Sequence, residues 1–236
     1  MNNKNYSSYG GSIILKRSLD ILENIMKNDG FLHFLNLYNG VKIECFGQIL
    51  SIENDIVVCK TTLLQILAIK EERNAFIVKD ENFSENLKAD IVSVDISNST
   101  VALKNFIYMP NLHANLRKYQ RVHPNRYTRV VLRQNNFEVK GNLYDISEGG
   151  LGIVSTECAP FDKKNPIMSE FDLEINSSKD ILSIGIELKL IADLVYRGAV
   201  RYCCQIIAGQ SIQVDIAKFS NERVRDTIKE LQSQID

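Results

Sequence analysis

The sequence lacks several features that would assign a protein to a class at once. It has only 12 Gly and 4 Pro in 236 residues. Its apolar runs, such as 13–15, fall far short of the ~20 residues that a membrane span needs, so we expect no such span. Hydrophobic residues make up 44% and charged residues 24% of the chain. These are ordinary globular values, which exclude collagen-like and disordered chains and allow one large domain or two of about 100 residues each.

An excess of basic residues is also missing. The 28 Lys and Arg residues are balanced by 29 Asp and Glu residues, which gives a formal net charge of −1. A protein that coats nucleic acid would show a clear basic excess, so we expect no nucleic-acid polymer as a partner. An anionic ligand would have to be bound by a few placed cations.

Motifs for metal binding and catalysis are absent from the sequence. The five Cys and three His residues lack the spacing of metal ligands, so we expect no metal site. There is no phosphate-binding loop, dinucleotide-binding glycine motif or nucleophile elbow, and we expect no cofactor and no enzymatic activity. Residues 1–10 lack the apolar core of a secretory signal, so we expect a cytoplasmic protein with reduced thiols.

Hydrophobic periodicity predicts a mainly β protein with a helix near each end. The first helix is expected at residues 12–28, docked on its own domain. Ser220 is expected to cap the last helix, whose apolar stripe is Val224, Ile228, Leu231 and Ile235. Residues 61–67 fit a helical turn or a strand. The expected strands are 31–38, 41–51, 55–59, 66–70, 75–78, 89–95, 100–105, 127–133, 137–145, 151–156, 168–175, 181–194 (bent or bulged) and 200–207.

Turn signals divide these strands into two groups. Asn39-Gly40 is a strong hairpin signal, and further turns are expected at 134–136 and 176–180. Pro110 and the polar residues after it interrupt the β pattern. We therefore expect two small β-barrels joined by a short linker. The predicted boundaries are an N-terminal helix region (1–30), a first β-barrel (31–108), the linker (109–122) and a second barrel with the C-terminal helix (123–236).

The linker ends in an R-x-x-x-R motif formed by Arg117 and Arg121. Guanidinium groups four residues apart can converge on one ligand if the segment is helical or curled. The planar guanidinium group pairs with phosphate oxygens and with the O6/N7 edge of guanine. The two arginines are therefore candidate ligands of a nucleotide.

A D-x-S-x-x-G motif follows at a turn between two strands. Asp145 and Ser147 alternate along the strand and should face the same side, where a carboxylate can accept from guanine or hold an Arg. Gly149 and Gly150 permit positive φ and leave no side chain between the backbone and a ligand.

The two motifs, in this order and separated by a hairpin, resemble the signature of PilZ domains, which bind the bacterial messenger cyclic di-GMP. The resemblance extends from about Arg117 to the C terminus and implies a six-stranded barrel with a C-terminal helix. It implies that the ligand-binding residues are Arg117, Arg121, Asp145, Ser147, Gly149 and Gly150. With a β-rich unit in front, the chain is similar to two-domain receptors of the flagellar-brake type.

Four residues around the arginine pair are secondary candidates: Leu116, Lys118, Val122 and His123. Leu116 stands where the family often has a further Arg that can help to bind a second ligand molecule, so one or two bound molecules are both open. Val122 matches the apolar residue that follows the pair.

The resemblance implies a receptor that changes its interdomain orientation on binding and signals to a protein partner, such as the flagellar motor or another motility or envelope system. The alternative is a PilZ-like scaffold that acts as an interaction module without a ligand. An enzyme acting on a nucleotide is the weakest interpretation, because no general base or metal cluster is visible.

The first β group contains an echo of the second motif. Asp95-Ile96-Ser97 repeats Asp145-Ile146-Ser147, but Thr100 stands in place of the glycine and no arginine pair precedes it. We interpret this echo as a hairpin turn and predict no second site.

Overall fold

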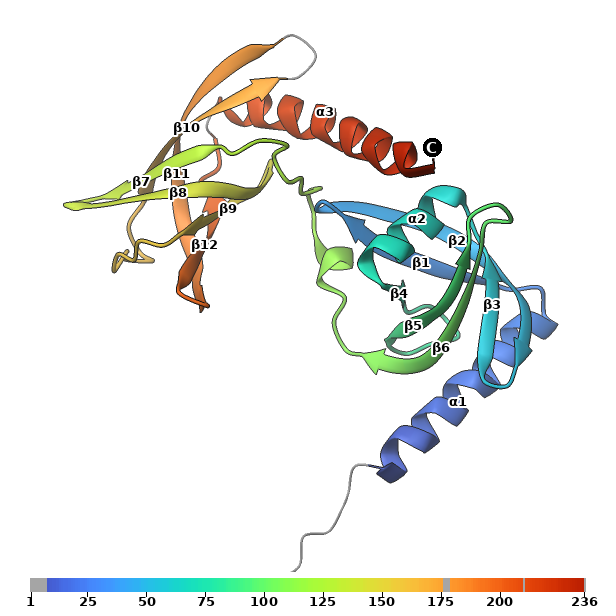
Figure 1. Ribbon diagram of the computed structural model, residues 1–236. Coiled ribbons are helices and arrows are strands. Elements are labelled where there is room, and N and C mark those ends of the chain that lie inside the picture. Colours follow the sequence, from blue (N-terminus) through green and yellow to red (C-terminus); the bar gives the residue numbers. More distant parts are fainter. Residues whose placement is uncertain (1–7, 176–178, 210, 236) are drawn as a thin grey trace, which may run out of the picture. The chain divides into compact units, whose positions relative to one another are not determined.

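The computed structural model describes residues 8–175, 179–209 and 211–235, which form two compact units (Figure 1). The first unit consists of residues 8–38, 42–117 and 230–235, and the second of 39–41 and the described part of 118–229. Each unit contains a closed six-stranded barrel, and the remaining elements are three α-helices and two short 3₁₀ helices. The predicted fold class, mainly β with two small barrels and terminal helices, is confirmed.

In the first barrel, the strand order around the ring is β1-β2-β3-β6-β5-β4. The predicted hairpin at Asn39-Gly40 is confirmed, since both residues have the positive φ (46° and 82°) that a two-residue turn requires. Phe34, Leu87 and Leu103 are fully buried in the interior. The strands are β1 (Phe31–Tyr38), β2 (Val41–Glu53), β3 (Ile56–Lys60), β4 (Asn74–Ile77), β5 (Asn86–Asp95) and β6 (Thr100–Met109).

The predicted strand at 66–70 is wrong, because this segment belongs to helix α2 (Leu63–Glu72). Thr62 caps the helix, since its side chain accepts a hydrogen bond from the Gln65 amide at 3.3 Å. Arg73 ends the helix in the left-handed conformation, with φ of 60°. The run 65–69 is buried throughout and does not alternate, and such a run cannot be distinguished from a buried strand by periodicity alone.

In the second barrel, the order is β7-β8-β9-β12-β11-β10, the same pattern as in the first. The expected irregularity of the long strand is confirmed by a register shift in β11 between Leu190 and Ala192. The expected turn at 134–136 is confirmed by φ of 52° at Asn135, whereas 176–178 of the other expected turn lie outside the described residues. The strands are β7 (Arg129–Gln134), β8 (Phe137–Ser147), β9 (Gly150–Ser155), β10 (Ile167–Ile175), β11 (Asp180–Tyr196) and β12 (Ala199–Ile206).

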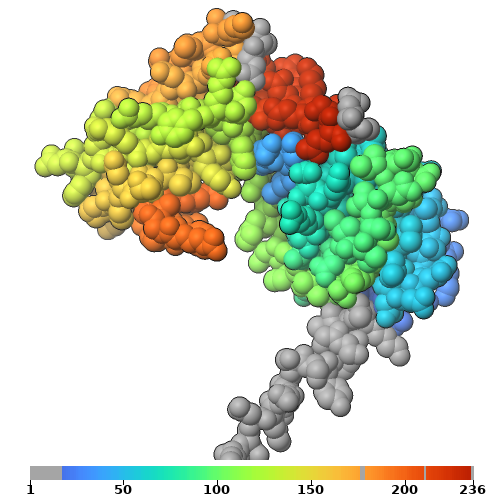
Figure 2. All heavy atoms as spheres, viewed as in Figure 1, coloured from blue at the N-terminus to red at the C-terminus, as the bar shows by residue number. Residues whose placement is uncertain are grey.

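The β11–β12 hairpin exposes apolar side chains at its tip. Val195 is 73% exposed and Tyr196 is 67% exposed. Figure 2 shows this orange hairpin at the surface of the second unit. The hairpin follows the register shift in β11, a position at which strands bend.

The first helix, α1 (Ser8–Lys27), docks on its own unit as predicted, because Leu22 and Ile25 are buried in the core of the first barrel. None of the described helices is long and apolar enough to cross a membrane. The short helices η1 (His113–Leu116) and η2 (Ser233–Ile235) follow β6 and the last α-helix, respectively.

The last helix, α3 (Gln213–Gln232), begins earlier than predicted, so Ser220 is a buried residue inside it and not its cap. The predicted stripe is also displaced, since Val224 and Ile228 are only half-buried. The buried face includes Arg223, whose Nε donates to the His123 carbonyl at 3.0 Å. Because the predicted stripe consisted of apolar residues alone, it did not include the charged Arg223. The Ile235 side chain lies outside what the structure describes.

Candidate functional site

The second unit contains a cleft of about 450 Å³. It lies between the β8–β9 turn and the end of the linker that carries Arg121, which we call the connector. Both sequence motifs reach this cleft, the first through Arg121 and the second through its two glycines. Two further strands complete the wall. The lining residues are Lys118, Tyr119, Arg121, Gly149, Gly150, Leu151, Ile191, Cys203, Cys204 and Gln205.

The connector is irregular and not helical. Helix η1 ends at Leu116, and Arg117 already has an extended backbone, with φ of −74° and ψ of 126°. Leu116, which is 73% exposed, and Arg117 both belong to the first unit. Of the two arginines of R-x-x-x-R, only Arg121 is part of the second unit, and the segment that carries the pair is not helical.

Val122 fastens the connector to the second barrel. Its amide donates to the Ile146 carbonyl and its carbonyl accepts from the Ile146 amide, both at 3.0 Å. The Val122 side chain is fully buried, so it is positioned to pack in the barrel and not to contact a ligand. Because Val122 follows Arg121 and Ile146 follows Asp145, this bridge brings the backbones of the two motifs close together.

Arg121 reaches from the cleft to a buried carboxylate. Its Nη1 atom lies 3.4 Å from Oδ2 of Asp145, and the two side chains are 36% and 5% exposed, respectively. A buried carboxylate requires a hydrogen-bonded cation, since its transfer from water is otherwise strongly unfavourable. The structure thus joins one residue of each motif in a single ion pair at the cleft.

Ser147 plays a local part in the turn. It is 3% exposed, and its Oγ donates to the carbonyl of Gly150 at 3.3 Å. Asp145 and Ser147 are both buried on β8, but their partners differ: Arg121 for the carboxylate and the backbone of the turn for the hydroxyl.

The glycines of the motif are required for space and not for positive φ, which corrects the conformational role expected for them. Neither Gly149 nor Gly150 has a positive φ. A Cβ atom on Gly149 would lie 2.6 Å from the ring of Tyr119, and one on Gly150 would lie 2.4 Å from the Cys204 carbonyl oxygen. Gly149 thereby lets the connector approach the turn, and Gly150 lets β9 approach β12.

Two of the flanking candidates contact aromatic rings. The Lys118 ammonium group lies 5.0 Å from the centroid of the Tyr119 ring at the cleft. The His123 ring lies 4.8 Å from that of Tyr144. Burial raises the pKa of Cys204 to about 12, so this thiol of the cleft wall is neutral at physiological pH. The cationic side chains that line the cleft are those of Lys118 and Arg121.

Sequence reasoning missed Arg201 and Tyr144. The Nη2 atom of Arg201 lies 2.6 Å from Oδ2 of Asp145, and its guanidinium group lies 4.2 Å from the centroid of the Tyr144 ring. Arg201 stands in a strand of apolar residues, and a cation within such a strand is the one signal that could have drawn attention to it. Its partner could not be read from the sequence, because β12 is separated from β8 by β9.

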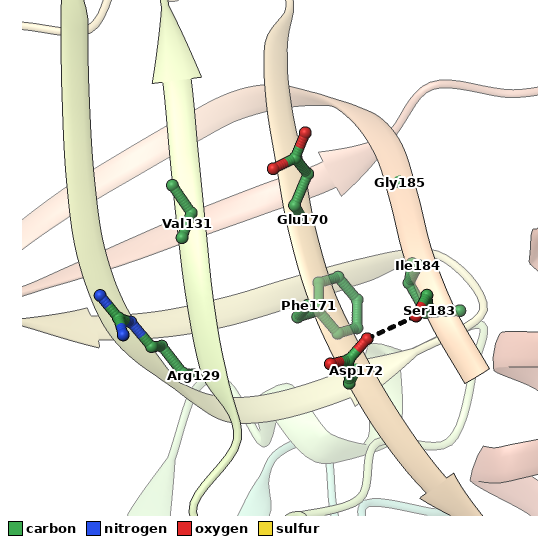
Figure 3. A pocket seen from close by; sticks show the side chains of 8 residues that line it. All are labelled: Arg129, Val131, Glu170, Phe171, Asp172, Ser183, Ile184 and Gly185. Carbon is green, nitrogen blue, oxygen red and sulfur yellow. Dashed lines mark hydrogen bonds between the residues drawn. The ribbon is translucent and has the colours of Figure 1, made fainter. Parts of the chain in front are cut away.

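A larger depression, of about 510 Å³, lies over β7, β10 and β11 of the same unit (Figure 3). It carries the carboxylates of Glu170 and Asp172 beside Arg129, and Ser183 donates to Asp172 at 2.7 Å. Glu170 is ion-paired with Arg133, so this depression has no excess of positive charge to attract an anionic ligand. In the described part of the chain, no group of three His, Cys, Asp or Glu side chains could hold a metal ion.

Comparisons with known proteins identify a family and several similar structures. The family model of the PilZ domain matches residues 115–219, a range that includes both motifs. No curated protein matches the chain. Among solved structures, the chain is similar to the Bacillus subtilis inhibitor of motility MotI/DgrA, with 11% identity, 83% of this chain and 96% of that chain covered, and a TM-score of 0.43.

Two further similar structures are complexes with cyclic di-GMP. Escherichia coli YcgR has 13% identity, with 92% of this chain and 93% of that chain covered and a TM-score of 0.43. Borreliella burgdorferi PlzA has 13% identity, with 89% and 99% covered and a TM-score of 0.30.

Proposed function

Because residues 115–219 of this chain are a PilZ domain, we propose that the protein is a receptor for cyclic di-GMP and that the cleft of the second unit binds it. The observation that carries the proposal is the ion pair between Arg121 and Asp145 at a cleft lined by Gly149 and Gly150. One pair joins the two motifs that distinguish this domain.

The chemistry of the lining suits this ligand. Cyclic di-GMP has two phosphodiester charges and two guanine bases, and Lys118 and Arg121 provide the cations to meet them. Charge-assisted hydrogen bonds stabilise a complex by about 1.5–3 kcal/mol each. A few such bonds outweigh the ordering of a short connector, at about 1–2 kcal/mol per residue.

Isothermal titration of the full chain with cyclic di-GMP tests the proposal. We expect Arg121→Ala to weaken binding about 10- to 150-fold, the loss of one charge-assisted interaction. Arg129→Ala is the matched control, because it removes an arginine from the other depression of the same unit, and it should bind like the wild type. Equal affinities of the wild type and Arg121→Ala would contradict the site.

We further propose that binding changes the orientation of the two units. The connector that carries Arg121 continues directly into the first unit, so ordering it on the second barrel would alter the position of the first. The altered surface would signal to a protein partner in motility or the envelope. Small-angle scattering with and without the ligand should give different profiles, and identical profiles would contradict the switch.

One observation favours the alternative, a scaffold that acts without a ligand. Asp145 is already paired with two arginines of the chain itself, Arg121 and Arg201. A scaffold would give no heat with cyclic di-GMP, and its protein partner would bind equally with and without the nucleotide. The same titration therefore distinguishes the two functions.

A further inference from the structure

Asp145 is shared by two arginines at unequal distances. Arg201 Nη2 lies 2.6 Å from Oδ2, whereas Arg121 Nη1 lies 3.4 Å from the same oxygen. Charge-assisted N–H···O bonds are strongest near 2.7–2.9 Å and weaken beyond ~3.2 Å. The strong bond of the carboxylate is therefore the one to Arg201, and Arg121 makes the weak one.

The position of Arg201 depends on its surroundings. Its guanidinium group lies over the Tyr144 ring, at 4.2 Å from the centroid, and only a third of its side chain is exposed. Stacking of a guanidinium group on an aromatic face fixes the plane of its donors. Tyr144 directly precedes Asp145 on β8, so the same stretch of strand supplies both the platform and the acceptor.

Because Gly152 has no side chain, the Arg201 side chain can extend across β9 to Asp145. The strands β8, β9 and β12 lie side by side (Figure 1). Asp145 pairs with Gly152, and Gly152 pairs with Cys203. A Cβ atom on Gly152 would lie 2.6 Å from Oδ1 of Asp145 and 3.4 Å from Nε of Arg201. The glycine thus leaves the space in which a side chain from β12 reaches one on β8.

We infer that Arg201 is a positioning residue of the ligand site, which binds the Asp145 carboxylate and so leaves Arg121 available to the ligand. This inference rests on the proposed function. The ion pairs of Asp145 in the described part of the chain are those with Arg121 and Arg201. Without Arg201, the buried carboxylate would have Arg121 as its remaining cation, and a ligand would have to break that pair before binding.

A double-mutant cycle tests this inference. Cyclic di-GMP is titrated into the wild type, Arg201→Gln, Asp145→Asn and the double variant. We expect Arg201→Gln to weaken binding about tenfold, and we expect the double variant to bind no more weakly than Arg201→Gln, because removal of the carboxylate releases Arg121. Arg201→Lys, which keeps a cation beside Asp145, should bind more tightly than Arg201→Gln.

Three results would overturn the inference. An unchanged affinity of Arg201→Gln would mean that Arg201 does not act on the site. Losses that multiply in the double variant would mean that Arg201 contacts the ligand directly. A purely structural role would lower the melting temperature of Arg201→Gln and leave the affinity of the folded protein unchanged, which also overturns it.

Thermal unfolding of the same four proteins without nucleotide separates this inference from the proposed function. If Arg201 binds Asp145, Arg201→Gln lowers the melting temperature less in the Asp145→Asn background than in the wild type. That coupling together with no heat from cyclic di-GMP would refute the proposed function alone. Heat from cyclic di-GMP without the coupling would refute the positioning role alone.

Discussion

At the scale of single residues, the site depends on positions where a side chain is missing. Gly149, Gly150 and Gly152 lie within one turn and the strand after it, and each is in close contact with a different neighbour. At Gly149 the neighbour is a ring, at Gly152 it is a carboxylate, and at Gly150 it is the backbone of β12. Substitution of each glycine by alanine should therefore have a different effect on the protein.

Gly150→Ala should destabilise the second unit. The new Cβ atom would lie 2.4 Å from the carbonyl oxygen of Cys204, and a backbone atom cannot move without separating β9 from β12. We expect the free energy of unfolding to fall by about 1–3 kcal/mol, as in other overpacked interiors. Denaturant unfolding followed by circular dichroism measures the loss.

Gly185→Ala is the control for this prediction. Gly185 lies on β11 of the same barrel, and no atom lies within 4 Å of its Cβ position. Its variant should unfold within about 0.5 kcal/mol of the wild type, as surface substitutions usually do. Equal stabilities of the Gly150 and Gly185 variants would contradict the prediction, because they would show that β9 and β12 can move apart to accommodate the new methyl group.

Some residues of the site could be predicted from a short stretch of sequence, and others could not. Arg121, Gly149 and Gly150 could be predicted, because each belongs to a short motif, and the structure brings them to one cleft. Arg201 could not be predicted, since its contact with Asp145 depends on the order in which β8, β9 and β12 pair. Strand pairing is a property of the whole barrel and leaves no local trace.

At the scale of elements, α2 shows how polar contacts fix a helix on a barrel. Oε2 of Glu72 accepts from Nδ2 of Asn36 at 2.7 Å and from the amide of Leu37 at 2.9 Å. Nε2 of Gln65 donates to Oδ1 of the same Asn36 at 3.1 Å. The helix is thereby joined to β1 at both of its ends. The apolar run of α2 gave no sign of these contacts, which is why the sequence favoured a strand.

Substitutions of Glu72 should reveal the balance between burial and hydrogen bonding. Burial raises the pKa of Glu72 above its usual 4.5, and the bonds from Leu37 and Asn36 act in the opposite direction. A group whose pKa is raised on folding contributes stability that is present below 4.5 and is lost as the pH rises through the raised value. The wild type should therefore be more stable relative to Glu72→Gln at pH 4 than at pH 7.

Urea unfolding of both proteins at the two pH values measures this difference. Glu72→Ala should lose about 1–3 kcal/mol at pH 7, because the amide of buried Asn36 is left with one partner fewer. Glu71→Gln, which changes an exposed carboxylate on the same helix, is the control. A relative stability of Glu72→Gln that does not change with pH would contradict the effect of burial.

At the scale of the whole molecule, two barrels with one strand order carry different chemistry. Counted from its first strand, each barrel closes in the order 1-2-3-6-5-4. Short strands between turn signals predicted both barrels, but the order of strands in the ring could not be predicted, because β3 pairs with β6 and β9 with β12 across intervening strands. The equality of the two orders is therefore visible only in the structure.

Because the two barrels have the same strand order, the positions of the two D-x-S sequences in them can be compared. Asp145 lies near the end of the second strand of its barrel, whereas Asp95 ends the fifth strand of the other. The corresponding turn of the first barrel, between β2 and β3, contains Asn54 and Asp55 and no glycine. The interpretation of the Asp95 sequence as a turn is consistent with this placement, since its carboxylate accepts from the amide and the side chain of Asn98 at 3.0 and 2.8 Å.

Asp95→Asn and Asp145→Asn form a matched pair for locating the ligand within the full chain. Each replaces one aspartate of a D-x-S sequence by its isosteric amide. We expect Asp145→Asn to weaken cyclic di-GMP binding about tenfold, because an amide accepts from the N–H groups of guanine more weakly than a carboxylate does. Asp95→Asn should change neither the affinity nor the stoichiometry in isothermal titration, since its hydrogen-bond partners lie within its own turn. A reduced stoichiometry of Asp95→Asn would place a second binding site in the first barrel, and the two equal strand orders would then reflect two functional copies of one domain.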